Sequence, residues 1–302
     1  MKELPNYSST PFFIVGAQRS GTTMLRLMLN AHPNLAVPFE SDFIPRFYLK
    51  HVEYGDLRIR ENAAKLLEAI SENSFVKRGK LIQDPHAVLS NSIASYRDLV
   101  NAIFGEYAKR NGKDRWGDKT PSYVSELDIL WNLFPGCRIV HLVRDGRDVA
   151  ASLGRLEWGS GHIPTVAEDW RWKTTLAHKI GAVLGEHYLE VRYEDLVLST
   201  EETLRTICAF LKEPFHGDML DFHVTAEKEM PSESMKWHRT SVQAPDDRKV
   251  SMWKRQMSLS DRIIFEQIAG ATLDLFGYER EHHPSTWGSR LKKLYYCTLK
   301  RS

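Results

Sequence analysis

The stretch from Gly16 to Thr23 has the residue types and spacing of an anion-binding loop. It reads G-x-x-x-x-G-T-T and follows the apolar run Phe12–Val15, which is typical of a buried strand. Backbone N–H groups of such a loop converge on an anion, and the helix that follows adds positive potential from its dipole. A P-loop has this spacing, but Thr22 stands where a nucleoside triphosphatase has lysine, and Arg19 is the cation instead. The loop therefore suits a phosphate better than ordinary NTP hydrolysis, although the motif alone is equally typical of a glycine turn.

A second strand–turn–helix pattern offers another set of anion ligands. Arg138–Val143 is a mostly apolar run, Arg144 follows at its end, and Ser152 lies in the helical stretch beyond. The planar guanidinium of arginine matches the oxygens of a phosphate. Because right-handed crossovers bring such loops to the carboxyl edge of one parallel sheet, we expect a second phosphate site beside the first.

Two charged residues near these loops could act on a bound ligand. Glu40 follows the first helix by one loop, so its carboxylate could reach the hydroxyl of an acceptor. Lys119 lies in W-G-D-K-T-P-S-Y at Trp116–Tyr123, which we predict to be a polar turn shaped by Gly117 and Pro121. From residue type alone, both side chains are equally well explained as solvated surface groups.

The elements that must position these residues follow from periodicity and from turn residues. Strands are predicted at Phe12–Val15, Arg138–Val143 and Tyr188–Tyr193. Helices are predicted around Met24–Ala31, Ala63–Ile70, Leu99–Tyr107, Ser122–Phe134, Val149–Leu153, Trp158–Leu184, Thr200–Leu211 (capped by Thr200) and Ser260–Gly277 (capped by Ser260). The stretch His216–Arg248 is polar and proline-punctuated, and it predicts a long loop able to fold over a ligand. Together these features predict an α/β fold with a P-loop-like, mostly parallel central sheet flanked by helices.

Bulk properties narrow the class of protein. The chain has 302 residues and no Gly/Ser-rich linker, so we expect one domain over 1–302, with a basic tail at about 287–302. A net charge of +2 does not indicate nucleic-acid binding. The three cysteines fit neither a metal site nor a disulfide framework, which favours a reducing cytoplasm. No stretch approaches the ~20 apolar residues of a membrane span, and the first residues lack the apolar region of a signal peptide.

The motifs in combination resemble the sulfotransferase family. The resemblance rests on Q-R-S-G-T-T at Gln18–Thr23, then Glu40, then W-G-D-K-T-P at Trp116–Pro121 and V-R-D-G-R-D-V-A-A-S at Val143–Ser152. Members of that family transfer a sulfuryl group from 3'-phosphoadenosine 5'-phosphosulfate (PAPS) to an acceptor. The resemblance, which is strongest to tyrosylprotein-type and carbohydrate-type enzymes, implies in-line displacement by an acceptor hydroxyl.

The resemblance also implies a role for particular residues. Glu40 would be the catalytic base, while Lys119 and Arg19 would stabilise the sulfuryl oxygens and the leaving phosphate. Arg144 and Ser152 would bind the 3'-phosphate of the nucleotide. The remaining nucleotide-binding positions implied are Arg19, Ser20, Gly21, Thr22 and Thr23 at the 5'-phosphate, Tyr193 after the third strand, and Trp253 and Lys254 in a segment that closes over the nucleotide.

Cofactors, partners and rival functions complete the expectations. No metal is expected, because lysine and arginine would replace the Mg²⁺ that phosphoryl transfer normally uses. The partners would be PAPS and a hydroxyl-bearing acceptor, with no nucleic acid and no transmembrane segment, and a homodimer stays open. The acceptor could be a tyrosine, a sugar, a lipid or a small molecule. Two rivals remain: a P-loop kinase, which would need a loop lysine and an acid for Mg²⁺, and a nucleotide-binding module without catalysis.

Overall fold

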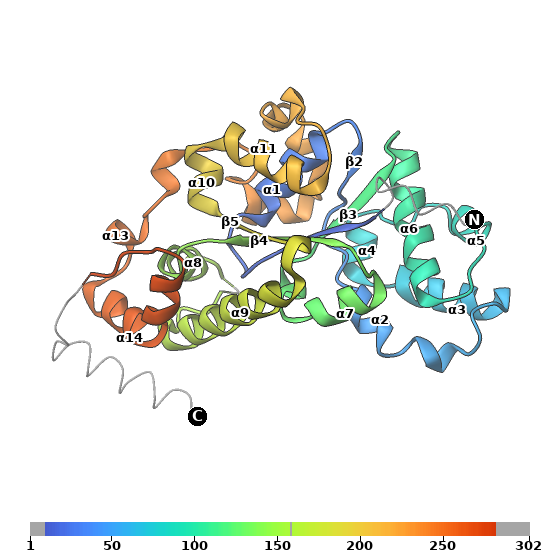
Figure 1. The fold of residues 1–302 in the computed structure, drawn as a ribbon, viewed down its shortest axis with the longest axis horizontal. Coiled ribbons are helices and arrows are strands. Elements are labelled where there is room, and N and C mark those ends of the chain that lie inside the picture. Colours follow the sequence, from blue (N-terminus) through green and yellow to red (C-terminus); the bar gives the residue numbers. More distant parts are fainter. Residues whose placement is uncertain (1–9, 158, 282–302) are drawn as a thin grey trace.

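A parallel sheet of five strands forms the centre of the protein, in a computed structural model that describes residues 10–157 and 159–281. The strands are β1 (Phe12–Val15), β2 (Leu35–Ala36), β3 (Arg115–Lys119), β4 (Arg138–Val143) and β5 (Tyr188–Arg192), in the spatial order β2-β3-β1-β4-β5. Every neighbouring pair is parallel. Helices lie on both sides of the sheet, with α1, α10 and α11 above it and α9 and α14 below it in Figure 1. The predicted α/β class with a parallel central sheet is therefore confirmed.

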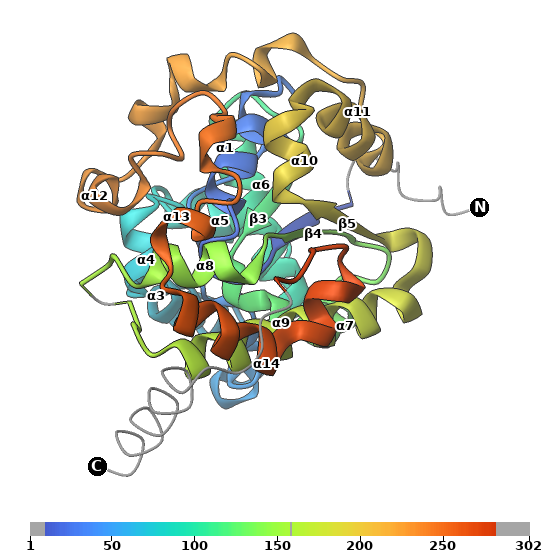
Figure 2. The ribbon, with the colours of Figure 1, turned by 90° about the vertical axis from the view of Figure 1, so that its left-hand side faces the viewer.

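The helices alternate with the strands along the chain. Their bounds are α1 Thr22–Ala31, α2 Ile44–Tyr48, α3 Arg60–Ser71, α4 Ser74–Arg78, α5 Pro85–Leu89, α6 Tyr96–Arg110, α7 Leu127–Leu133, α8 Gly146–Leu153, α9 Ile163–Leu184, α10 Tyr193–Leu198, α11 Thr200–Leu211, α12 Met235–His238, α13 Trp253–Gln256 and α14 Leu259–Leu275. The segment between α11 and α14, orange in Figure 2, runs along one side of the molecule and contains α12 and α13. Apart from these two short helices it contains only short 3-10 turns, as expected for a long loop.

The prediction of a polar turn at Trp116–Tyr123 is wrong over its first four residues. Residues Arg115–Lys119 form strand β3, which pairs with both β1 and β2 and is buried throughout. The stretch lacks the β-branched and aliphatic residues typical of a strand. It can still be buried, because its polar side chains form hydrogen bonds inside the protein. Gly117 lies against the ring of Phe12, where an added Cβ would be 2.4 Å from Phe12 Cζ. A glycine that looks like a turn residue is thus required by close packing within the sheet.

Other differences concern the ends of elements. The predicted Ser122–Phe134 helix is a 3-10 turn at Pro121–Ser125 followed by α7. Ser258 caps α14 in place of Ser260, since Ser258 Oγ accepts a hydrogen bond from the Asp261 N–H at 3.2 Å. The residue at the N-cap of α11 is Ser199. The basic stretch 287–302 lies outside the described residues, so its role stays a prediction.

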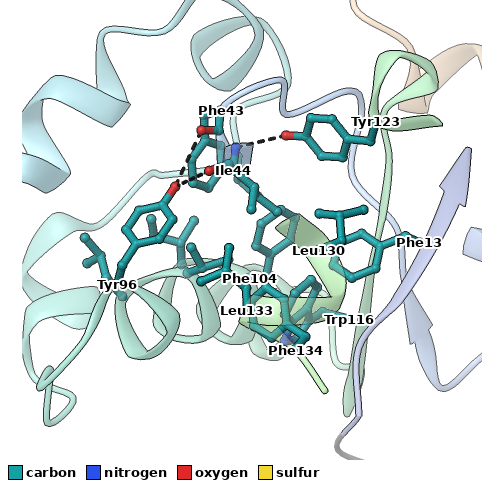
Figure 3. Packing of buried hydrophobic residues seen from close by; sticks show 14 of the residues in the cluster. Phe13, Phe43, Ile44, Tyr96, Phe104, Trp116, Tyr123, Leu130, Leu133 and Phe134 are labelled. Atoms are coloured by element: carbon teal, nitrogen blue, oxygen red, sulfur yellow. Dashed lines mark hydrogen bonds between the residues drawn. The ribbon is translucent and has the colours of Figure 1, made fainter. Parts of the chain in front are cut away.

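An aromatic core cluster supports the loop that follows β2 (Figure 3). Phe104 stacks on Trp116 with ring centroids 4.4 Å apart. Above them, Ile44 is held at both backbone polar groups: its N–H donates to Tyr123 Oη at 3.0 Å, and its carbonyl accepts from Tyr96 Oη at 2.9 Å. These bonds fix the chain four residues beyond Glu40 and so restrict where that carboxylate can lie.

Candidate active site

The first anion loop joins β1 to α1 and has the backbone of a phosphate cradle. Gly21 is the N-cap of α1 in the left-handed region, with φ 93°, and Arg19 also has a positive φ of 68°. No side chain caps the helix. The Met24 N–H donates to the Gly21 carbonyl, which leaves the N–H groups of Thr22 and Thr23 for a ligand. Ser20, within the loop, and Thr22, at the start of α1, are both buried. The sequence folds this way because glycine tolerates positive φ and because the apolar face of α1 packs on the sheet.

The second anion loop lies beside the first, because β4 pairs directly with β1. Arg19 Nε donates to Ser152 Oγ at 3.1 Å, and Arg144 Nη1 donates to the Arg19 carbonyl at 3.3 Å. The Arg144 guanidinium also lies over the ring of Tyr193, 4.3 Å from its centroid. Burial and the neighbouring Arg144 charge lower the pKa of Arg19. Four predicted site residues thus form one contiguous group across three β–α junctions, those after β1, β4 and β5.

Glu40 and Lys119 form an ion pair at the same edge of the sheet. Lys119 Nζ lies 2.6 Å from Glu40 Oε1 and donates to Thr23 Oγ1 at 3.3 Å, which links the pair to the first anion loop. The Lys119 side chain is fully buried and that of Glu40 is 19% exposed. Burial lowers the pKa of Lys119, while the Glu40 carboxylate opposes this shift. A buried lysine next to one carboxylate can still offer its other N–H donors to an anionic ligand.

Asp118 connects the strand that carries Lys119 with the loop that carries Glu40. Its Oδ2 accepts a hydrogen bond from Ser41 Oγ at 2.6 Å, and Thr120 Oγ1 donates to its Oδ1 at 3.3 Å. Complete burial raises the pKa of Asp118 to about 7. The aspartate therefore contacts the residue after Glu40, a position suited to orienting the loop.

These residues surround a cavity of about 600 Å³. The predicted site residues in its wall are Arg19, Gly21, Thr22, Thr23, Glu40, Arg144 and Tyr193. Ser20, Lys119 and Ser152 are buried beside that wall. The cavity wall includes neither Trp253 nor Lys254. The ring of Trp253 is buried 3.7 Å from the Arg147 guanidinium, and its backbone N–H donates to Asp148 at 2.7 Å.

Several residues of the wall were not singled out from the sequence. They come from three separate segments and are Phe39, Phe75, Arg78, Ser234, Trp237, His238, Thr240 and Ser241. The only signal for the last five was the expectation that the loop His216–Arg248 folds over a ligand. His86 is exposed on α5 and does not line the cavity.

Over 10–157 and 159–281, no cluster of three or more His, Cys, Asp or Glu side chains could hold a metal ion. Over the same ranges, no helix has both the length and the apolar composition needed to cross a bilayer.

Comparison with known proteins gives consistent matches. Residues 11–217 match the model of the sulfotransferase family. The nodulation protein NoeE of Sinorhizobium fredii is 27% identical over 89% of this chain and 66% of its own length, and a Drosophila melanogaster protein-tyrosine sulfotransferase is 27% identical over 91% and 53%. The chain thus spans about half to two thirds of the length of these relatives. The sulfotransferase domain of the Synechococcus PCC 7002 olefin synthase shares the fold, with a TM-score of 0.63 and 24% identity over 93% of this chain and 99% of that domain.

Proposed function

The chain belongs to the sulfotransferase family, and from that premise we propose that it transfers the sulfuryl group of PAPS to the hydroxyl of an acceptor. The observation that carries the proposal is the meeting of two β–α anion loops and the Glu40–Lys119 pair around one cavity. Two phosphate-binding groups on adjacent strands suit a nucleotide with phosphates at both the 5' and 3' positions, and a carboxylate across the cavity suits the acceptor.

The first anion loop would bind the 5'-phosphosulfate. Ser20, Gly21, Thr22 and Thr23 offer backbone N–H and hydroxyl donors at the start of α1, where the helix dipole favours an anion. Arg19 adds a positive charge from the same loop.

The second anion loop would bind the 3'-phosphate. Arg144 and Ser152 supply a guanidinium fork and a hydroxyl, and the Tyr193 ring packs against Arg144. Trp253 and Lys254 do not line this cavity, so the proposal gives them no part in binding the nucleotide.

The chemistry would be a direct displacement at sulfur. The acceptor oxygen forms a bond to sulfur while the bond from sulfur to the bridging oxygen of the 5'-phosphate breaks, and the hydroxyl proton passes to Glu40. Negative charge grows on the leaving phosphate, where Lys119 and Arg19 stabilise it. Lys119 lies within 2.6 Å of Glu40 and 3.3 Å of Thr23, so it can be shared between the base and the donor site.

The acceptor would enter through the part of the cavity that faces away from the two anion loops. Aromatic side chains of Phe39, Phe75 and Trp237 lie in this wall together with Asp42 and Arg78. Incubating the protein with radiolabelled PAPS and mixtures of phenols, saccharides, hydroxylated lipids and peptides tests the proposal. Turnover with none of them, together with no affinity for the bisphosphate nucleotide, would refute it. A homodimer and a cytoplasmic location stay predictions.

Selectivity for the 3'-phosphate is the first testable consequence. 3',5'-Bisphosphoadenosine should raise the melting temperature by mass action, whereas 5'-AMP should bind much more weakly. Arg144→Ala should cost roughly 1.5–3 kcal/mol of affinity for the bisphosphate, the usual size of a hydrogen bond to a charged group. Titration calorimetry with both nucleotides measures this. Equal affinity of the wild-type protein for the two would remove Arg144 and Ser152 from the binding site.

Gly21 provides a second test, which concerns the first anion loop. A Cβ at this position would lie 2.4 Å from Tyr193 Cδ2, on a backbone with φ 93°. Gly21→Ala should therefore strain the loop by roughly 1–2 kcal/mol from the left-handed backbone alone, and it should weaken bisphosphate binding further by displacing Tyr193. Gly105→Ala is the matched control, since a Cβ there meets nothing within 4 Å. Unchanged nucleotide affinity in Gly21→Ala would place the nucleotide elsewhere.

A further inference from the structure

His238 enters the cavity from a part of the chain that carries none of the sequence motifs. It is the last residue of α12, in the long segment between α11 and α14, and it lines the cavity together with Glu40. Its ring contacts the edge of Phe39, with centroids 6.3 Å apart at an interplanar angle of 86°. Phe39 precedes Glu40 and also lies 5.2 Å from Lys119 Nζ. One aromatic side chain therefore lies against both His238 and the Glu40–Lys119 pair.

The two ring nitrogens of His238 have different surroundings. Nδ1 is buried and has no hydrogen-bond partner among the described residues. Nε2 is not buried in this way, and because His238 lines the cavity, we take Nε2 to be the nitrogen open to it. A buried N–H without an acceptor is rarer in proteins than an unprotonated atom in the same position. The neutral ring is therefore expected to carry its proton on Nε2, as a donor toward the cavity.

Burial and the charges around His238 both favour the neutral imidazole. Burial, followed by the nearby charges of Lys119 and Arg19, lowers its pKa to about 3. An imidazole that stays neutral at physiological pH does not add a further positive charge to Arg19, Arg144 and Lys119. It can instead serve as a hydrogen-bond donor of fixed orientation, because its ring is packed on Phe39.

We propose that His238 is an acceptor-positioning residue whose Nε2–H donates a hydrogen bond to the acceptor hydroxyl beside Glu40. A hydroxyl oxygen has one proton and two lone pairs. With the proton directed to Glu40 and one lone pair held by His238, the second lone pair is left to attack sulfur. The assignment rests on the proposed sulfuryl transfer, and it adds a specific contact on the acceptor side of the site. The nucleotide does not require this contact.

Three substitutions separate positioning from simple packing. His238→Phe keeps the ring contact with Phe39 but removes the N–H. His238→Gln loses the ring but can present an amide N–H near the position of Nε2. His238→Ala loses both. His86→Phe, at an exposed histidine outside the cavity, is the control for the chemical change itself.

The measurements are kcat and KM with phenol, methyl glycosides and serine peptides as acceptor probes, together with bisphosphate nucleotide affinity and melting temperature. His238→Phe should lower kcat by about 10-fold to 100-fold, the scale expected when a reacting group is misplaced. His238→Gln should retain most of the rate, and nucleotide affinity should be unchanged in both.

Different results identify different failures. A phenylalanine variant as active as wild type, with a damaged glutamine variant, would show that His238 only packs against Phe39 and would overturn the assignment. A loss of nucleotide affinity in His238→Phe would place the residue on the donor side and overturn it as well. If the wild-type protein neither binds the bisphosphate nor transfers sulfuryl to any probe, the proposed function falls first and the assignment with it. Wild-type turnover with no effect of any His238 variant would reject the assignment alone.

Discussion

Glu40→Gln is expected to lower kcat by about 10²–10⁴-fold, the range for losing a positioned general base. Glutamine keeps the size of the side chain but cannot accept the proton of the acceptor hydroxyl. The loss should be smaller with acidic phenols, which need less help in losing a proton. Nucleotide affinity should stay near wild type, because in the proposed reaction Glu40 contacts the acceptor and not the nucleotide.

The same substitution removes the ion-pair partner of a fully buried lysine. We therefore expect Glu40→Gln to lower the melting temperature as well, and kcat must be measured on protein shown to be folded. Glu53→Gln, at an exposed glutamate, is the matched control. If Glu40→Gln keeps more than about a tenth of wild-type kcat, the loss of rate is smaller than the loss expected for removing a general base. Glu40 would then serve only to hold Lys119.

Lys119→Met should reduce kcat by about 10²–10³-fold, the usual effect of removing one preorganised donor from a developing negative charge. Methionine is similar in length and suits the buried site, which limits the loss of packing. The reduction should be the same for acidic and weakly acidic acceptors, because Lys119 acts on the leaving phosphate. This independence distinguishes it from Glu40→Gln.

Kinetics with a series of phenols of different acidity provide the measurement for Lys119→Met. Lys109→Met, on the exposed face of α6, controls for the loss of a lysine charge. A rate loss that shrinks with acidic phenols would mean that Lys119 acts through Glu40 and not on the leaving group.

The parts of the fold that could be predicted from sequence are those whose signals are local. Strands β1, β4 and β5 have mostly apolar sequences, and each anion loop joins such a strand directly to a helix. Strand β3 was missed because burial of Asp118 and Lys119 depends on partners far away in the chain, at Ser41 and Glu40. Strand β2 has only two residues, which is too short for a periodic pattern.

The residues of the candidate site also fall into those with a local sequence signal and those without one. The residues of the anion loops could be named from motifs, and the structure brings Arg19, Arg144 and Ser152 together. Trp237 and His238 could not be named, since no spacing relates them to the loops, and their position depends on how the long segment crosses the molecule. Trp253 differs from these residues, because its ring packs against Arg147 and its role at the nucleotide stays a prediction.

The parts of the cavity that we propose for the nucleotide and for the acceptor are built from different kinds of structure, and this has an evolutionary consequence. The nucleotide half lies on loops between paired strands of the central sheet, where an insertion would disturb several elements at once. The acceptor half is contributed by connecting segments around Phe39, Phe75 and Trp237, which lie outside the sheet. Such segments tolerate changes in length and sequence far better than paired strands. A lineage could therefore exchange one acceptor for another by remodelling these connections while inheriting its sulfuryl donor unchanged.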